Sequence, residues 1–178
     1  MRDRYGEQAA RLGVQDPLDL RPKEVTRGTR RWVYPMMDAV ISGIEAGDPA
    51  CCVIGVEFLE EDAKFSFGSI LKSRCARALR RAELSEALAT RLRRRIVAML
   101  LAGNVPREYR EYARLLRRVG FENLWPRIEA GVSRQNKYVM RYFTYFEMIH
   151  HGSPAVIRRP RHAPSCHEDA DPAAIVRK

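Results

Sequence analysis

The segment from Asp48 to Gly120 limits the possible fold more than any other part of this chain, because helix start and stop signals alternate along it. Asp48 followed by Pro49 is typical of a helix start, with the aspartate as N-cap and proline at the first helical position. Gly103 and Gly120 are typical of helix ends. The pattern predicts four consecutive amphipathic helices, over residues 48–62, 66–83, 85–103 and 106–119.

Helical periodicity also covers most of the chain outside this segment. We expect a helix over 26–46 with Pro35 as an interior kink, a short helix over 121–131 and a last helix over 136–150. In the last helix, four residues at helical spacing predict a core-facing stripe: Tyr138, Tyr142, Tyr145 and Ile149. No strand-like alternation of useful length is found. The predicted class is therefore all-α, with about seven helices arranged as antiparallel hairpins in a short stack or a compact bundle.

Composition divides the chain into three parts. Residues 1–25 carry a short helical pattern and then a stretch rich in proline and charge, and we expect them to form an N-terminal arm. Residues 26–152 are predicted to form the helical-repeat domain. From Gly152 onward, proline, histidine, alanine and charged residues follow without periodicity. Residues 153–178 are thus predicted to be a flexible, basic, Pro-rich tail that can become ordered on a partner.

The predicted helix pairs follow one another about every 35–40 residues, which is typical of helical-hairpin solenoids. They contain the segments Val56 to Asp62 (VEFLEED), Ser69 to Lys72 (SILK) and Arg107 to Leu115 (REYREYARL). In these segments, over residues 50–120, the chain resembles bacterial HEAT-like helical proteins of poorly defined function. The resemblance implies hairpins stacked as a short right-handed superhelix that is used as a binding surface. It implies no catalytic residues.

Cysteine usage and the lack of long apolar runs indicate the cellular setting. Cys51, Cys52 and Cys75 fall in apolar helical stretches and, with Cys166, show no disulfide spacing, so buried free thiols are expected. The first residues lack the apolar core of a secretory signal, and the apolar runs are too short to span a membrane. We expect a bacterial cytoplasmic protein with no membrane partner.

The positive charge of this chain is carried by arginine, which outnumbers lysine by 27 to 5 at a net charge of +10. At 100° per residue, the arginines of helices 66–83 and 106–119 fall on the side opposite the predicted core face. Helix 85–103 instead carries its arginines all around its polar side, as solvation alone would give. The two striped helices therefore predict a binding ridge: Arg74, Arg77, Arg80, Arg81, Arg107, Arg110, Arg114, Arg117 and Arg118.

Such a ridge suits several anionic partners, provided that the two helices occupy equivalent places in successive hairpins. The first hypothesis is a non-enzymatic binding or scaffold module that contacts an acidic protein partner or assembles within a larger complex. The alternative is a nucleic-acid-binding protein that contacts the phosphate backbone without sequence specificity, because no base-reading motif is present. The chain's own acidic cluster is a further possible partner: Glu57, Glu60, Glu61 and Asp62. A merely solvated face is the remaining interpretation.

Enzymatic function has little support in the sequence. It contains no glycine-rich phosphate loop, dinucleotide fingerprint or nucleophile elbow, and we expect no cofactor. Asp38 and Glu57 are the acidic residues within apolar helical stretches, where each is either a structural partner of an arginine or a general base acting on a nucleic acid or small anion. The candidate metal ligands fit no paired zinc pattern, so no metal is expected: His150, His151, His162, Cys166 and His167.

Overall fold

The computed structural model describes residues 1–63, 65 and 67–152, and in this part of the chain it is mainly helical. This confirms the predicted all-α class, with eight α-helices, one short 3-10 helix and a two-stranded hairpin among the described residues. In chain order the elements are α1 (Arg2–Leu12), β1 (Lys23–Arg27), β2 (Arg30–Tyr34), α2 (Met36–Ala46), α3 (Pro49–Glu61), α4 (Gly68–Arg81), α5 (Glu86–Leu101), α6 (Tyr109–Val119), η1 (Glu122–Leu124), α7 (Trp125–Gly131) and α8 (Lys137–Gly152).

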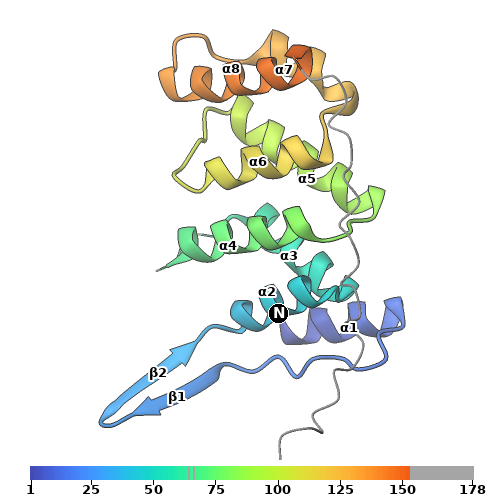
Figure 1. The fold of residues 1–178 in the computed structure, drawn as a ribbon, viewed down its shortest axis with the longest axis vertical. Coiled ribbons are helices and arrows are strands. Elements are labelled where there is room, and N and C mark those ends of the chain that lie inside the picture. The colour runs from blue at the N-terminus through green and yellow to red at the C-terminus, as the bar shows by residue number, and fades with distance from the viewer. Residues whose placement is uncertain (64, 66, 153–178) are drawn as a thin grey trace, which may run out of the picture.

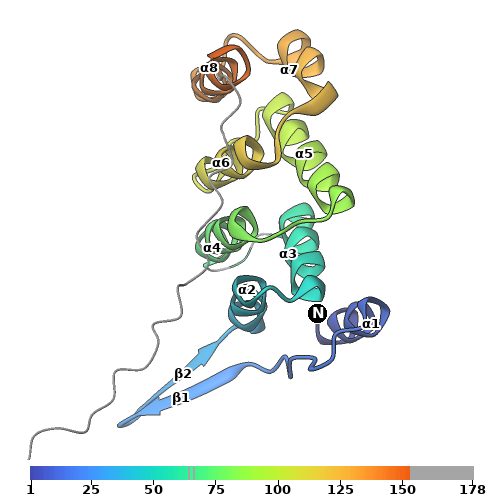
Figure 2. The same ribbon diagram turned by 45° about the vertical axis from the view of Figure 1, so that its right-hand side comes forward.

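The helices form two columns, because helices that are two apart in the chain pack on each other (Figure 1). Figure 2 shows α2, α4, α6 and α8 above one another in one column, and α1, α3, α5 and α7 in the other. Successive helices such as α2 and α3, or α5 and α6, pack across the gap between the columns. The result is a two-layer stack whose two outer sides are each formed by alternate helices.

The helix α3 is the most deeply buried element. All residues from Ala50 to Val56 are buried, as are Phe58 and Leu59, because α3 packs against α1, α2, α4 and α5. Its start is the one that the sequence predicts. The Asp48 carboxylate accepts hydrogen bonds from the backbone N–H groups of Ala50 at 2.8 Å and Cys51 at 3.1 Å.

The same carboxylate ties the N-terminal helix to the stack. The buried Tyr5 of α1 donates its hydroxyl proton to Asp48 Oδ2 at 2.8 Å and accepts a hydrogen bond from the Leu18 N–H at 2.7 Å. Burial raises the pKa of Tyr5 to about 12, with the Leu18 N–H opposing and Asp48 adding to the shift. The phenol is therefore a proton donor at neutral pH. One side chain thus holds α1, the segment after it and the start of α3 together.

The helices α2 and α3 approach closely at Gly43. A Cβ built on Gly43 would lie 2.8 Å from Leu18 Cδ1 and 3.1 Å from Cys51 Cβ, and it would also meet Cys51 Sγ. These distances are shorter than ordinary van der Waals contacts, so a side chain at position 43 would force Leu18 and Cys51 to shift, and glycine allows the close approach. By contrast, a Cβ on Gly6 in α1 would meet nothing within 4 Å.

Three cysteines lie in this core. Cys51, Cys52 and Cys75 are free and buried, which confirms the expectation for them, whereas Cys166 lies outside the described residues. Burial is the larger cause and the negative charge of Asp48 the smaller one that together raise the pKa of Cys52 to about 11. These thiols are packing groups and stay protonated at neutral pH.

The helix predicted over residues 26–46 is wrong in its first part. Residues 23–34 form an antiparallel hairpin in which Thr26 pairs with Arg31, and Gly28 has a φ of 60° in the two-residue turn. Pro35 is the N-cap of α2 and not an interior kink. Proline removes a backbone donor and disfavours the helical conformation in the residue before it, so a helix starts readily after it but seldom continues through it.

Other boundaries differ by a few residues. α4 begins at Gly68, two residues after Ser66, which lies outside the described residues, and it ends at Arg81. α6 begins at Tyr109 and not at Pro106. The short helix expected over 121–131 is η1 followed by α7.

The domain boundaries stay a prediction, although two features of the structure bear on the boundary expected at residue 25. α1 and Leu20 belong to the same core as the later helices, and β1 runs across the expected boundary at residue 25. The predicted tail, 153–178, lies outside the described residues. Among the residues that the structure describes, no helix is both long and apolar enough to cross a lipid bilayer.

Replacing the Asp48 cap should loosen α3 and α1 together. We expect Asp48→Ala to lower the free energy of unfolding by about 1–2 kcal/mol, because two backbone donors and the Tyr5 hydroxyl lose their acceptor. Chemical denaturation monitored by circular dichroism measures this loss. Asp16→Ala, at an exposed position, is the control and should change stability by less than about 0.5 kcal/mol. Equal effects of the two substitutions would contradict the capping role.

Gly43 and Gly6 should respond to substitution by alanine with opposite signs. Gly43→Ala should destabilise the protein by about 1–3 kcal/mol, because the new methyl group overpacks the contact with α3. Gly6→Ala should leave stability unchanged or raise it by up to about 1 kcal/mol, because α1 has open space there and alanine favours helix. Thermal melts of both variants test the pair, and a neutral Gly43→Ala would show that α2 and α3 can separate at no cost.

Candidate functional site

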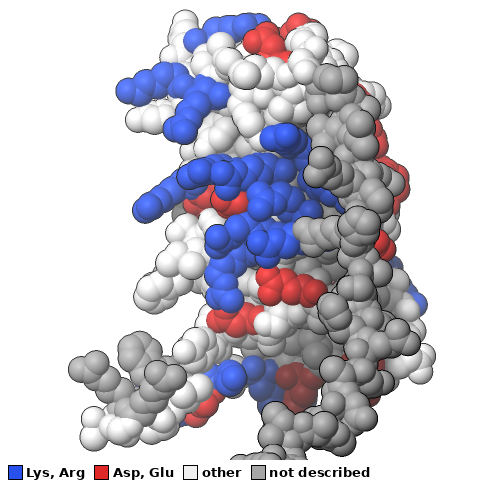
Figure 3. All heavy atoms as spheres, in the orientation of Figure 1, with Lys and Arg blue, Asp and Glu red and all other residues white. Residues whose placement is uncertain are grey.

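The arginines of α4 and α6 gather on one face of the stack, as the angular analysis predicts. α4 and α6 are neighbours in the column of even-numbered helices. In the orientation of Figure 1, Lys and Arg side chains form a broad band over these two helices (Figure 3). We call the nine predicted residues the arginine face: Arg74, Arg77, Arg80, Arg81, Arg107, Arg110, Arg114, Arg117 and Arg118. Arg107 lies in the turn before α6 and the others lie on the two helices.

Part of the arginine face is neutralised by carboxylates of the same column. From α2, Asp38 forms an ion pair with Arg74, and Glu45 lies 3.6 Å from Arg81. On α6, Glu111 is shared between two arginines, at 3.5 Å from Arg80 and 2.9 Å from Arg114. The arginines nearest α2 therefore have structural partners.

The remaining arginines of this face make no ion pair with a carboxylate of the described residues: Arg77, Arg107, Arg110, Arg117 and Arg118. All five are exposed. Their positive charges lie mainly on and just before α6, and the described chain leaves them without compensation. This half of the arginine face is the candidate binding surface.

The acidic cluster at the end of α3 does not neutralise the arginine face. Its four carboxylates have partners elsewhere. Arg4 of α1 lies 3.5 Å from Glu57 and 2.5 Å from Glu61. Arg91 lies 2.5 Å from Glu60, and Asp62 lies 2.5 Å from Lys72 and 3.1 Å from Arg95. Basic side chains of the two following helices, Lys72, Arg91 and Arg95, thus neutralise part of this cluster. None of the four carboxylates pairs with a residue of the arginine face among the described contacts, so the cluster is not a partner of that face there.

An open hollow of about 430 Å³ lies where α4 and α6 meet on the arginine face. Its lining has mixed character: Ser69, Ile70, Ser73 and Arg77 from α4, and Arg107, Glu108, Arg110 and Glu111 from the start of α6. Ile70 is 56% exposed, and Glu108 is buried. The hollow therefore offers guanidinium groups and an apolar side chain to a partner within a single concave surface.

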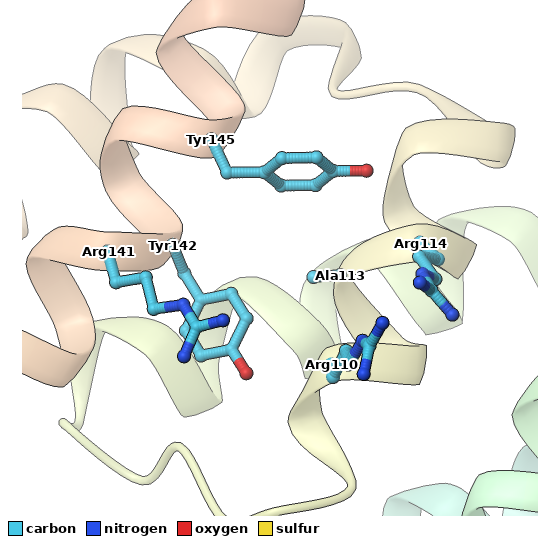
Figure 4. A pocket seen from close by; sticks show the side chains of 6 residues that line it. All are labelled: Arg110, Ala113, Arg114, Arg141, Tyr142 and Tyr145. Atoms are coloured by element: carbon cyan, nitrogen blue, oxygen red, sulfur yellow. The ribbon is translucent and has the colours of Figure 1, made fainter.

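A second, smaller pocket of about 180 Å³ lies between α6 and α8. Figure 4 shows Arg110 and Arg114 on α6 opposite Arg141, Tyr142 and Tyr145 on α8, with Ala113 between them. The ring of Tyr145 reaches across the pocket with its hydroxyl directed toward α6. All charged side chains that line this pocket are positive.

The aromatic side of the small pocket is held in place by the core. Tyr142 packs edge-to-face on the buried Tyr109 with ring centroids 4.7 Å apart, and Tyr109 donates its hydroxyl to the Ile96 carbonyl at 3.0 Å. Burial raises the pKa of Tyr142, while the charges of Arg141 and Arg110 act in the opposite direction. The Tyr142 hydroxyl is therefore a proton donor at neutral pH, in a position set by α6.

The prediction of a core-facing stripe on α8 is confirmed only in part, because Tyr142, Tyr145 and Ile149 pack against the core while partly exposed and Tyr138 does not. The buried residues of α8 are Val139, Phe143 and Phe146, whereas Tyr138 is 60% exposed. The two stripes are offset by one residue and have the same spacing, so periodicity alone does not separate them. A tyrosine at the edge of the core can keep its hydroxyl in water, whereas phenylalanine has no polar group to satisfy. This difference favours the stripe with Phe143 and Phe146 as the core side of α8. This offset is why the sequence analysis missed the small pocket.

The catalytic and metal alternatives find no support in the geometry. Asp38 pairs with Arg74 and Glu57 pairs with Arg4, and neither carboxylate lines the two pockets described above. His150 stacks on Trp125 with centroids 4.4 Å apart. Within residues 1–63, 65 and 67–152, no group of three histidine, cysteine or acidic side chains could hold a metal ion. His162, Cys166 and His167 lie outside the described residues.

Comparison of the chain with protein-family models, with curated proteins and with solved structures gave no match. The resemblance to HEAT-like proteins therefore stays a prediction.

Proposed function

We propose that this protein is a non-enzymatic binding module whose arginine face binds an acidic surface of a partner protein, alone or within a larger complex. The observation that carries the proposal is the set of exposed arginines on and before α6 that have no carboxylate partner among the described residues. Arginine matches carboxylates with two parallel hydrogen bonds, so a row of free guanidinium groups suits an acidic protein surface.

The mixed lining of the larger hollow favours a protein partner over a nucleic acid. Ile70 offers apolar contact beside Arg77 and Arg110, and arginine with apolar or aromatic neighbours is typical of protein interfaces. The carboxylates of Glu108 and Glu111 line the same hollow and would repel phosphates. An acidic protein that also carries apolar side chains suits both features.

Nucleic-acid binding is the second candidate, and the free arginines of the face together with the net charge of +10 favour it. Each phosphate that is neutralised releases counterions, so such binding weakens steeply as salt rises. A protein interface with apolar contacts depends less on salt, and this difference separates the two candidates.

The test compares two triple variants of equal charge. Arg77, Arg107 and Arg110 are replaced by alanine in one variant, and the exposed Arg11, Arg94 and Arg127 of the other column are replaced by alanine in the control. We expect the first variant to bind a fluorescein-labelled glutamate- and leucine-rich peptide more weakly by roughly fivefold to a hundredfold, since each exposed pair contributes about 0.3–1 kcal/mol. Fluorescence anisotropy measures the affinity.

The control variant loses the same net charge but keeps the arginine face intact, so it should bind this peptide within about twofold of the unchanged protein. Equal losses in both variants would show that only net charge matters, which contradicts a defined face. Labelled duplex and single-stranded DNA are measured in parallel across a salt series. Tighter binding of DNA than of the peptide, with a steep salt dependence, would replace the proposal by the nucleic-acid alternative.

A further inference from the structure

The pocket between α6 and α8 differs in charge from the rest of the arginine face. The hollow between α4 and α6 contains Glu108 and Glu111, whereas the α6–α8 pocket is lined by three arginines and no carboxylate. Arg110 and Arg141 form no ion pair with a described residue, and Arg114 shares its partner Glu111 with Arg80. An occupant of this pocket therefore has to bring more than one negative charge to neutralise it.

The pocket also offers neutral hydrogen-bond donors. The hydroxyl groups of Tyr142 and Tyr145 make no hydrogen bond within the part of the chain that the structure describes, and both tyrosines line the pocket. Tyr142 is fixed by its packing on Tyr109, and the Tyr145 ring covers one side of the pocket (Figure 4). Guanidinium and phenol groups from two helices thus line one small volume.

The size and donor set select among anions. The volume of about 180 Å³ is an order of magnitude above the ~10–15 Å³ that a cavity needs to hold one water, so a tetrahedral anion with a few attached atoms fits. A phosphate monoester carries about −1.5 to −2 charge at pH 7 and three strong acceptor oxygens, whereas a carboxylate carries one charge and two oxygens. Three arginines match the first better than the second.

We propose that the α6–α8 pocket is a subsite for a phosphate monoester on a side chain of the acidic partner, held by Arg110, Arg114 and Arg141. The hydroxyls of Tyr142 and Tyr145 donate to the remaining phosphate oxygen positions. This inference rests on the proposed function, because the arginine face brings the partner to the pocket. Phosphorylation of the partner then strengthens the complex, because the phosphate contacts the arginines and tyrosine hydroxyls of the pocket, which an unmodified acidic segment does not contact.

The experiment uses the full chain and three matched peptides. They share one glutamate- and leucine-rich sequence and differ at a central position, which is serine, glutamate or phosphoserine. Isothermal titration calorimetry should show phosphoserine binding about tenfold or more tighter than serine, with glutamate between them, since each charge-assisted hydrogen bond to the phosphate adds affinity. An equal gain from glutamate and phosphoserine would show a general charge effect and overturn the phosphate subsite.

Arg141→Ala separates the pocket from the arginine face, because Arg141 is exposed on α8 and is not among the nine residues of that face. The variant should lose the phosphoserine gain while it binds the serine peptide as the unchanged protein does. Arg127→Ala, on α7, is the matched control and should keep the gain. A gain that survives in Arg141→Ala would overturn the proposal. Failure of the serine peptide to bind the unchanged protein would instead count against the proposed function.

Competition distinguishes the sources of the phosphate. Inorganic phosphate, adenosine monophosphate and a 5′-phosphorylated oligonucleotide are each added to the complex with the phosphoserine peptide. We expect each to displace the peptide only at concentrations far above the dissociation constant of the peptide. Inorganic phosphate and adenosine monophosphate are too small to engage the arginine face as well, and the oligonucleotide brings no apolar side chain to Ile70. Displacement by any of them near that constant would assign the pocket to that ligand and overturn the protein-borne phosphate.

Discussion

Burial of α3 is the constraint on which the rest of the structure depends. The sequence from Ala50 to Leu59 is apolar on almost its whole circumference, so this helix has to be enclosed by other elements on several sides. α1, α2, α4 and α5 supply that enclosure. α2 and α4 cover the side of α3 that faces the other column, and α1 and α5 lie on either side of α3 within its own column. The two columns therefore meet at α3, and the later helices continue them.

The column arrangement explains how charge becomes concentrated on one face. Helices two apart in the chain present their polar sides in the same direction, so arginine stripes on α4 and α6 become adjacent although the whole of α5 lies between them in sequence. The carboxylates of α2 neutralise the part of the face near α2, and the surplus of positive charge lies toward α6 and α8. The charge gradient along this column is a product of stacking and not of local sequence.

The features predicted correctly are those that local physics decides. The Asp48-Pro49 start and the outward direction of Arg110 and Arg114 follow from capping chemistry and helical geometry, and the structure agrees with both. The hairpin before Pro35 was missed because its two strands are short and alternate weakly. The α6–α8 pocket was missed because it requires knowing which side of α8 meets α6. That choice is made by the packing of Phe143 and Phe146 and by long-range contacts that periodicity cannot supply.

The hydrogen bond between Tyr5 and Asp48 has a consequence for the order of folding. The two residues are 43 positions apart in the chain, so α1 has no docking surface until α3 has been made and has started to form. A short helix of this kind is marginal in water while it is alone. During synthesis we therefore expect α1 to remain loosely structured until α3 is present for it to pack on. The docking of α1 is thereby tied to the formation of the α3 cap, because the same Asp48 carboxylate serves both.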